Sequence, residues 1–170
     1  MRPATIWIHT LLVLCAVLLT VAPADAQLRF GGGVHYLRAL GDIKDAPDFD
    51  ENALGFMGSV DFRVPLLRIE GDVEFIPDYY NSSELMIQPQ AYGLLGSLLY
   101  GGVGLGIGHL GNFGWQKPFF ALRAGVDFML GGLDLDVFAS YRFQKADDLK
   151  TINEDSLNAI TFAALIRFGS

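Results

Sequence analysis

Apolar and polar residues alternate with a period of two along most of this chain. The clearest example is residues 67–75, where Leu67, Ile69, Val73 and Phe75 interleave with Arg68, Glu70, Asp72 and Glu74. A period of two places successive side chains on opposite faces of a β-strand, whereas a helix repeats about every 3.6 residues. The pattern predicts strands, and no convincing helical period follows residue 27.

The same alternation recurs in eight segments and predicts an all-β fold. The expected strands cover residues 28–36, 54–63, 67–75, 88–98, 100–109, 119–129, 133–143 and 157–168. The connections alternate between long (41–52, 77–86, 110–118 and 144–156) and short (at Pro65, Leu98-Leu99 and Gly131-Gly132). This order is typical of an antiparallel up-and-down transmembrane β-barrel, with long loops outside the cell and tight turns toward the periplasm.

Alternation alone does not distinguish a membrane barrel, with its apolar face outward, from a soluble lipocalin-like barrel, with its apolar face inward. Three features favour the membrane barrel. The four lysines after residue 27 all fall in expected loops, and a water-exposed strand face would ordinarily carry lysine too. They are Lys44, Lys117, Lys145 and Lys150. Glycines on the polar face would make room inside a narrow barrel: Gly31, Gly33, Gly102, Gly104, Gly106 and Gly108. Strands of about 10–13 residues can also cross a hydrocarbon core when tilted.

Charges on the polar face of the expected strands nearly balance. They comprise six arginines (Arg29, Arg63, Arg68, Arg123, Arg142 and Arg167) and seven acids (Asp61, Glu70, Asp72, Glu74, Asp127, Asp134 and Asp136). This balance predicts an ion-pair network in the lumen, because an unpaired buried charge costs several kcal/mol. The alternative is a solvated strand face. Since side chains just fill an eight-stranded interior, we expect no wide aqueous pore.

The N-terminal segment has the pattern of a cleaved secretory signal peptide over residues 1–26. Arg2 precedes an apolar run that ends at Ala24-Asp25-Ala26, and this small-x-small pattern is typical of a cleavage site. The alternative is an uncleaved anchor helix. We therefore expect one outer-membrane domain over residues 27–170. Cys15 is the only cysteine, so that domain would have neither a disulfide nor a thiolate metal site.

The acidic excess lies mainly in the expected loops. The net charge is −7, and the first loop alone contains Asp42, Asp45, Asp48, Asp50 and Glu51 against Lys44. Such loops could attract divalent cations or a basic partner, or simply keep the outer rim hydrated. An acidic chain without a phosphate-binding loop argues against nucleic acid as a partner.

Two aromatic pairs stand at strand ends beside long loops. They are Phe113 with Trp115, and Tyr79 with Tyr80. Amphipathic rings favour the membrane–water interface, which predicts an aromatic girdle. Contact with a ligand or a host surface is the alternative.

The eight alternating segments resemble the small outer-membrane β-barrels of the OmpA, OmpX and opacity-protein kind. The resemblance covers residues 27–170 as architecture, without one diagnostic motif. The last segment resembles the signal that such proteins present to the barrel-assembly machinery, with Ile160, Phe162, Ile166 and Phe168 alternating, although Gly169 and Ser170 follow the final aromatic residue. The resemblance implies the outer membrane, contact with membrane lipid and lipopolysaccharide, assembly by that machinery, a monomer and no cofactor.

Candidate catalytic chemistry is sparse. His35 and His109, the two histidines after residue 27, lack a metal-ligand spacing. His35 with Ser59 or Ser140 and a lumen carboxylate has the composition of a hydrolase or acyltransferase site, but its position on the polar face separates it from lipid. We predict a non-enzymatic protein presenting four external loops for surface interaction or envelope integrity. The alternatives are a lipid-modifying enzyme and a narrow conduit for small or apolar solutes.

Overall fold

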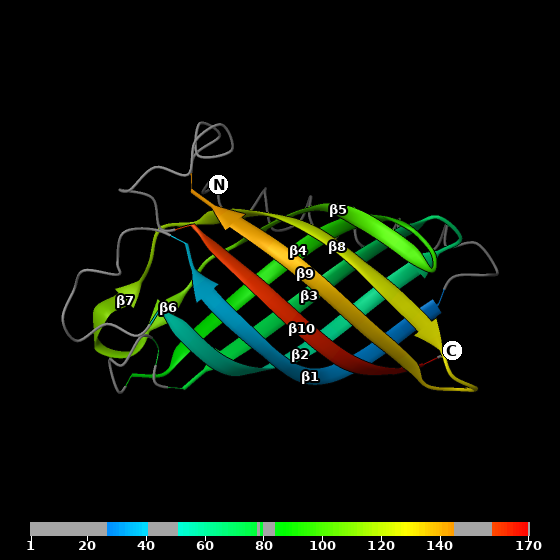
Figure 1. The fold of residues 1–170 in the computed structure, drawn as a ribbon, viewed down its shortest axis with the longest axis horizontal. Coiled ribbons are helices and arrows are strands. Elements are labelled where there is room, and N and C mark those ends of the chain that lie inside the picture. The colour runs from blue at the N-terminus through cyan, green and yellow to red at the C-terminus, as the bar shows by residue number, and fades with distance from the viewer. Residues whose placement is uncertain (1–26, 41–50, 78, 80–83, 145–157, 170) are drawn as a thin grey trace, which may run out of the picture.

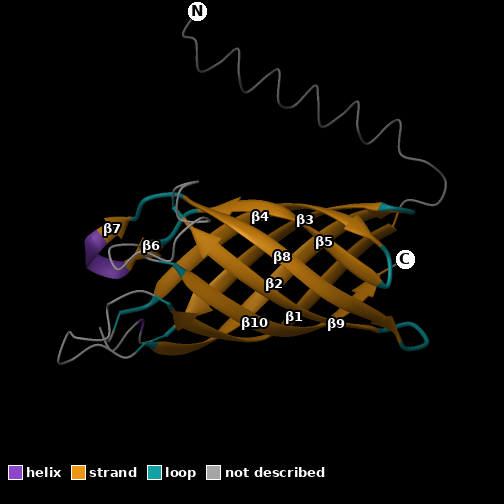
Figure 2. Ribbon diagram, turned by 45° about the horizontal axis from the view of Figure 1, so that its top comes forward, coloured by secondary structure: helices purple, strands orange, loops and turns teal. Residues whose placement is uncertain are grey.

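Eight long strands form a closed antiparallel barrel in the computed structural model, which describes residues 27–40, 51–77, 79, 84–144 and 158–169 (Figures 1 and 2). The strands are β1 (Gln27–Ala39), β2 (Asn52–Val64), β3 (Leu67–Ile76), β4 (Met86–Gly96), β5 (Leu99–Gly106), β8 (Phe119–Met129), β9 (Asp134–Phe143) and β10 (Ala159–Gly169). Each pairs with its neighbours in sequence, and β1 pairs with β10 to close the sheet. This confirms the predicted fold class. The segment proposed as a signal peptide lies outside the described residues.

The expected strand over residues 100–109 is wrong at its end. It stops at Gly106, and a short hairpin follows in the expected loop, made of β6 (His109–Leu110), a 3₁₀ turn (Gly111–Phe113) and β7 (Gly114–Trp115). The Ile107 N–H donates to the Pro89 carbonyl over 3.1 Å, but Pro89 has no N–H to return the bond. The ladder is therefore interrupted there and resumes where Ile87 pairs with His109.

No helix among the described residues is long and apolar enough to span a membrane.

The three predicted tight turns are confirmed, and they lie at one end of the barrel (Figure 2). Gly131 and Gly132 have positive φ angles of 63° and 105°, which suits a two-residue hairpin turn of type I′. None of the turns carries a charged residue: their sequences are Pro65-Leu66, Ser97-Leu98 and Leu130-Gly131-Gly132-Leu133. The side chains of Leu66, Leu98 and Leu130 are exposed, so this end of the barrel has apolar tips.

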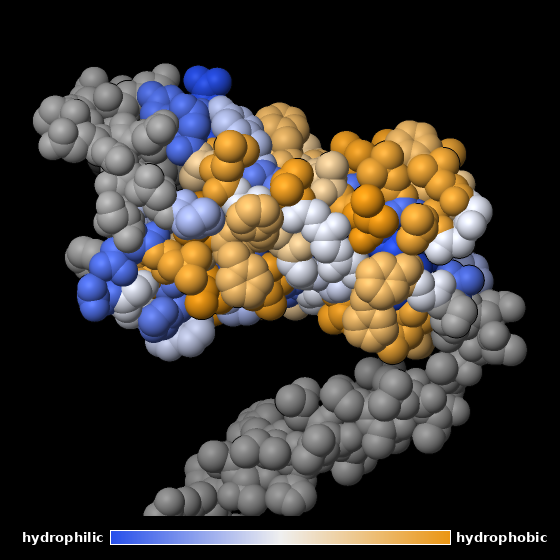
Figure 3. All heavy atoms as spheres, turned by 90° about the horizontal axis from the view of Figure 1, so that it is seen from below, coloured by the Kyte–Doolittle hydropathy of each residue, from blue (hydrophilic) through white to orange (hydrophobic). Residues whose placement is uncertain are grey.

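The apolar face of the strands points outward. In β3, Arg68, Glu70, Asp72 and Glu74 are at most 2% exposed, whereas Leu67, Ile69, Val73 and Phe75 are between 36% and 51% exposed. Apolar side chains cover the barrel wall on the face shown in Figure 3. This is the arrangement of a membrane barrel and the reverse of a lipocalin-like one.

Aromatic residues form two outward bands with small residues between them. Phe56 pairs with Phe75 toward the loop end, and Phe30 pairs with Phe168 toward the turn end. Between the bands, the outer face of every long strand contributes glycine or alanine: Gly32, Gly58, Gly71, Gly93, Gly101, Ala124, Ala139 and Ala164. Two aromatic bands that flank an apolar wall are typical of transmembrane barrels.

Cysteine scanning of β3 should distinguish the two faces. We expect a lipid-soluble thiol reagent to label cysteines at positions 69, 73 and 75 at least ten times faster than cysteines at 68, 70 and 72, since the latter replace side chains that are nearly fully buried. Labelling rates in micelles would measure this. Faster reaction at positions 68, 70 and 72 would mean that the barrel is inside out.

Candidate functional site

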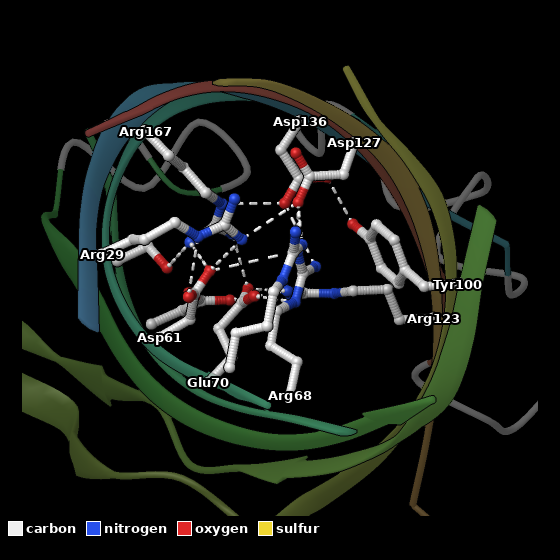
Figure 4. Close-up of polar contacts among 12 residues, drawn as sticks. Arg29, Asp61, Arg68, Glu70, Tyr100, Arg123, Asp127, Asp136 and Arg167 are labelled. Carbon is white, nitrogen blue, oxygen red and sulfur yellow. Dashed lines mark hydrogen bonds and ion pairs between the residues drawn. The ribbon is translucent and has the colours of Figure 1, made fainter. Parts of the chain in front are cut away.

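The lumen holds all thirteen charged residues that sequence analysis placed on the polar face. Each of the six arginines lies within ion-pair distance of at least one of the seven acids. In Figure 4 the labelled lumen residues point toward one another from several strands. Because side chains on a strand alternate between faces, the period-two spacing of these charges places all of them inside.

Nearest the turn end, Arg29 is the centre of the network. Its guanidinium contacts Asp61 over 2.7 Å and Asp127 over 3.0 Å, and it also pairs with Asp134. Arg63 pairs with the same Asp127. The Arg29 side chain is 2% exposed, so these contacts are shielded from water. One planar guanidinium offers five N–H donors in a fixed fork that matches carboxylate geometry, whereas a lysine ammonium offers three donors and no such fork.

In the middle of the lumen, two arginines share carboxylates across the barrel. Arg167 contacts Asp61 over 3.2 Å, Glu70 over 2.9 Å and Asp136 over 2.9 Å. Arg68 lies 3.2 Å from Asp136 and 3.0 Å from Glu70. The network therefore connects β2, β3, β9 and β10, and a single substitution would leave charges unpaired on several strands.

Arg123 occupies the centre of a stack of aromatic rings. Its guanidinium carbon lies 3.5 Å from the Tyr92 ring centroid and 3.8 Å from that of Phe138. The same guanidinium pairs with Glu70 over 2.5 Å and with Asp72 over 2.8 Å. Cation–π and ionic contacts thus act on one charge in a site from which water is excluded.

These lumen aromatics were not among the residues predicted from the sequence. Tyr92, Tyr100 and Phe138 are at most 7% exposed, and the Tyr100 hydroxyl donates to Asp136 over 2.5 Å. A signal for Phe138 was present, because it stands two residues from both Asp136 and Ser140 and so shares their face.

Toward the loop end the charges give way to amides and apolar groups. Arg142 pairs with Glu74 and donates to the Gln88 side chain over 2.7 Å. Closer to the loops lies a cluster of buried apolar residues: Leu37, Ala39, Ala53, Ile76, Met86 and Ala159. Tyr79 packs against this cluster, so its predicted place in an outer girdle is wrong. Trp115 is exposed in β7. Tyr80 and the side chain of Phe113 lie outside the described parts.

Lumen glycines leave space for the large side chains of their neighbours. A Cβ atom at Gly104 would lie 2.3 Å from the Tyr92 ring, and one at Gly125 would lie 2.5 Å from the Tyr100 hydroxyl. A Cβ atom at Gly31 would lie 2.8 Å from the Arg167 side chain. These positions explain how three bulky lumen residues fit inside an eight-stranded wall.

Both serines considered for a catalytic site are hydrogen-bonded to arginines, and the histidine is buried. The Ser59 hydroxyl accepts a hydrogen bond from Arg167 over 2.7 Å, and the Ser140 hydroxyl accepts one from Arg123 over 3.0 Å. His35 is 1% exposed, and neither of its ring nitrogens has a hydrogen-bond partner. No group of three metal-ligating side chains occurs within the described ranges.

The residues of β10 that were predicted to form an assembly signal face outward. Phe162, Ile166 and Phe168 are more than half exposed, and Ile160 is partly buried. They alternate with lumen residues such as Leu165 and Arg167. The last strand therefore presents an apolar outer face beside the seam with β1.

A closed eight-stranded up-and-down barrel with a charged lumen and an apolar wall is the fold of the small transmembrane β-barrels. No protein-family model matches the chain. No curated protein matches it either.

Solved structures share this fold. The crystal structure of Neisserial surface protein A superposes with a TM-score of 0.57 at 16% identity, covering 83% of this chain and 96% of that one. The attachment invasion locus protein of Yersinia pestis, solved in complex with the heparin analogue sucrose octasulfate, superposes with a TM-score of 0.50 at 16% identity, covering 86% of this chain and 99% of that one. The fold of the small outer-membrane barrels is thereby confirmed.

Proposed function

We propose that this chain is an integral outer-membrane protein whose closed barrel anchors four external loops, with surface interaction or envelope integrity as its role. The observation that carries the proposal is the apolar wall, because exposed large hydrophobic side chains occur on all eight long strands. Soluble monomers rarely expose a continuous apolar surface of this kind. Membrane lipid and lipopolysaccharide would cover the wall.

The lumen network supports a structural role for the barrel. With ion pairs and stacked rings across its middle, the interior leaves little room for solute to pass, and a closed sheet has no free edge for a second chain to join. A monomeric anchor therefore suits these contacts better than a conduit. The outward Ile160, Phe162, Ile166 and Phe168 would serve recognition by the barrel-assembly machinery during biogenesis.

The loop charges favour a different partner from the one bound to the Yersinia pestis protein. That protein was solved with a sulfated polyanion, whereas the segment between β1 and β2 here contains Asp42, Asp45, Asp48, Asp50 and Glu51. Like charges repel at short range. We therefore propose that the loops contact a cationic surface or divalent cations, and binding of calcium against binding of heparin would test this.

Gel mobility in detergent tests the membrane proposal directly. Unboiled protein should migrate differently from boiled protein and show a β-type circular dichroism spectrum in micelles, because a closed barrel resists unfolding by detergent. Protein that stays monomeric in buffer without detergent would contradict the proposal.

Two assays separate the remaining roles. Hydrolysis or acyl transfer on labelled phospholipid or lipid A would identify an enzyme, and conductance across a planar bilayer would identify a conduit. We expect neither signal above the empty-membrane background, because Ser59 and Ser140 accept hydrogen bonds from arginines and the middle of the lumen is closed by ion pairs and aromatic rings.

A further inference from the structure

A cavity of about 350 Å³ lies at the loop end of the lumen. Its lining comes from the loop ends of β1, β4, β8, β9 and β10. Leu37, Met86 and Phe119 contribute apolar walls, and Gln88, Arg142 and Asn158 contribute polar groups. Cavities that bind small molecules typically measure about 300–1,000 Å³ and combine apolar walls with a few polar groups. The size suits a ligand of one ring or a short chain.

Asn158 is the unusual group in this lining. It is 0% exposed, and neither its amide oxygen nor its amide nitrogen has a hydrogen-bond partner. The Arg142 Nε is also buried without a hydrogen bond, although the other nitrogens of that guanidinium contact Glu74 and Gln88. An unsatisfied buried polar group costs roughly 1–3 kcal/mol. Two such groups on one cavity indicate a polar occupant that accepts hydrogen bonds.

The charge of the lining indicates the sign of that occupant. Among the described lining residues the charged side chains are Arg142 and Lys117, and none is a carboxylate. Lys117 is exposed and stands at the outer rim, whereas Arg142 is 4% exposed. Because Arg142 is already paired with the buried Glu74, the net positive charge of the lining comes from Lys117, and this charge favours an anionic group at the entrance.

The cavity does not continue through the barrel. Deeper in the lumen Arg123 is 3% exposed and lies between the Tyr92 and Phe138 rings, which are each 3% exposed. A molecule that enters from the loop end must leave by the same end. The geometry therefore suits binding and not passage.

We propose that this cavity binds a small amphipathic monocarboxylate. Its apolar body lies against Leu37, Met86 and Phe119, and its carboxylate accepts hydrogen bonds from the Asn158 amide and the Arg142 Nε. Lys117 attracts the anion at the entrance. This proposal rests on the proposed function in one respect: if the loops face the cell exterior, the ligand enters from there.

The test uses the full chain in nanodiscs, titrated with hexanoate and followed by the methyl NMR signals of Leu37 and Met86. Hexanamide has the same shape without the charge, and empty nanodiscs report partitioning into lipid. We expect saturable binding of hexanoate, with hexanamide at least tenfold weaker. Equal affinity for the two compounds, or shifts that never saturate, would overturn the proposal.

Two variants separate binding from folding. Asn158→Leu keeps a similar shape and removes the unpaired amide. It should weaken the affinity for hexanoate at least tenfold, while the urea concentration at the midpoint of unfolding stays unchanged or rises. Lys117→Gln should weaken hexanoate about threefold and leave hexanamide unaffected. An Asn158→Leu protein with a lower midpoint and unchanged affinity would mean that the amide is structural. Membrane insertion is read separately by gel mobility, so failure of either proposal can be recognised.

Discussion

Gly33→Ala should destabilise the barrel by about 3 kcal/mol or more, whereas Gly32→Ala should leave its stability unchanged or raise it slightly. A Cβ atom at Gly33 would lie 2.0 Å from the carbonyl oxygen of Ala164 and 2.7 Å from the Cα of Leu165. Both atoms belong to the backbone of β10, so relief requires the seam between β1 and β10 to open. Overpacking costs roughly 1–3 kcal/mol even where side chains can move.

The adjacent glycine provides the matched control for this effect. A Cβ atom at Gly32 would face outward and meet nothing closer than the Met57 carbonyl oxygen at 3.7 Å. Replacing glycine by alanine without strain stabilises a protein by about 0.4–1 kcal/mol, because it lowers the conformational entropy of the unfolded chain. Urea titration of both variants in micelles would measure the contrast. Equal urea midpoints for the two variants would mean that β1 and β10 can move apart at the seam enough to accept the added methyl group.

Arg123→Ala should lower the free energy of unfolding by about 3–5 kcal/mol, because Asp72 and Glu70 each lose a buried ion-pair partner. Arg123 is 3% exposed and also supports the Tyr92 and Phe138 rings. Lys117→Ala is the matched control, since an exposed charge contributes only about 0–1 kcal/mol. The free energies of unfolding in micelles, measured at a common denaturant slope, would report the difference.

A second substitution identifies the cause of that loss. The ion pair of Asp72 among the described residues is with Arg123, so Asp72→Asn should recover part of the stability lost in Arg123→Ala by removing the orphaned charge. A double variant less stable than Arg123→Ala alone would indicate that lost packing, and not the unpaired carboxylate, dominates.

The fold could be predicted from the sequence because a barrel wall obeys a local rule. Over residues 67–75 the polarity of each side chain indicates whether it faces the lumen or the outside. The structure confirms both the strand and the outward direction of its apolar face. The rule weakens at Gln88, Pro89 and Gln90, where amides face the lumen and proline stands on the outer face. There the predicted strand began two residues late, and the interruption opposite Pro89 was missed.

Partner choice inside the lumen could not be predicted in the same way. The spacing of charges shows that Arg29 and Asp127 share the lumen, but their contact depends on the tilt and stagger of strands far apart in sequence. The same holds for the Arg123 stack, whose two rings come from β4 and β9. Nor does periodicity reveal a cavity, because an unfilled space follows from the sizes of side chains on five strands together.

The uncharged turns have a consequence for how the barrel enters a preformed bilayer. Whichever end crosses first must shed its water, and shedding water from charged groups is far more costly than shedding it from leucine. The turn tips present Leu66, Leu98 and Leu130, whereas the segment between β1 and β2 contains five acids. We therefore expect spontaneous insertion into vesicles to be vectorial, with the turns leading and the loops left on the side from which the protein was added. Trypsin added outside the vesicles would then reach Lys145 and Lys150, between β9 and β10, in nearly every molecule.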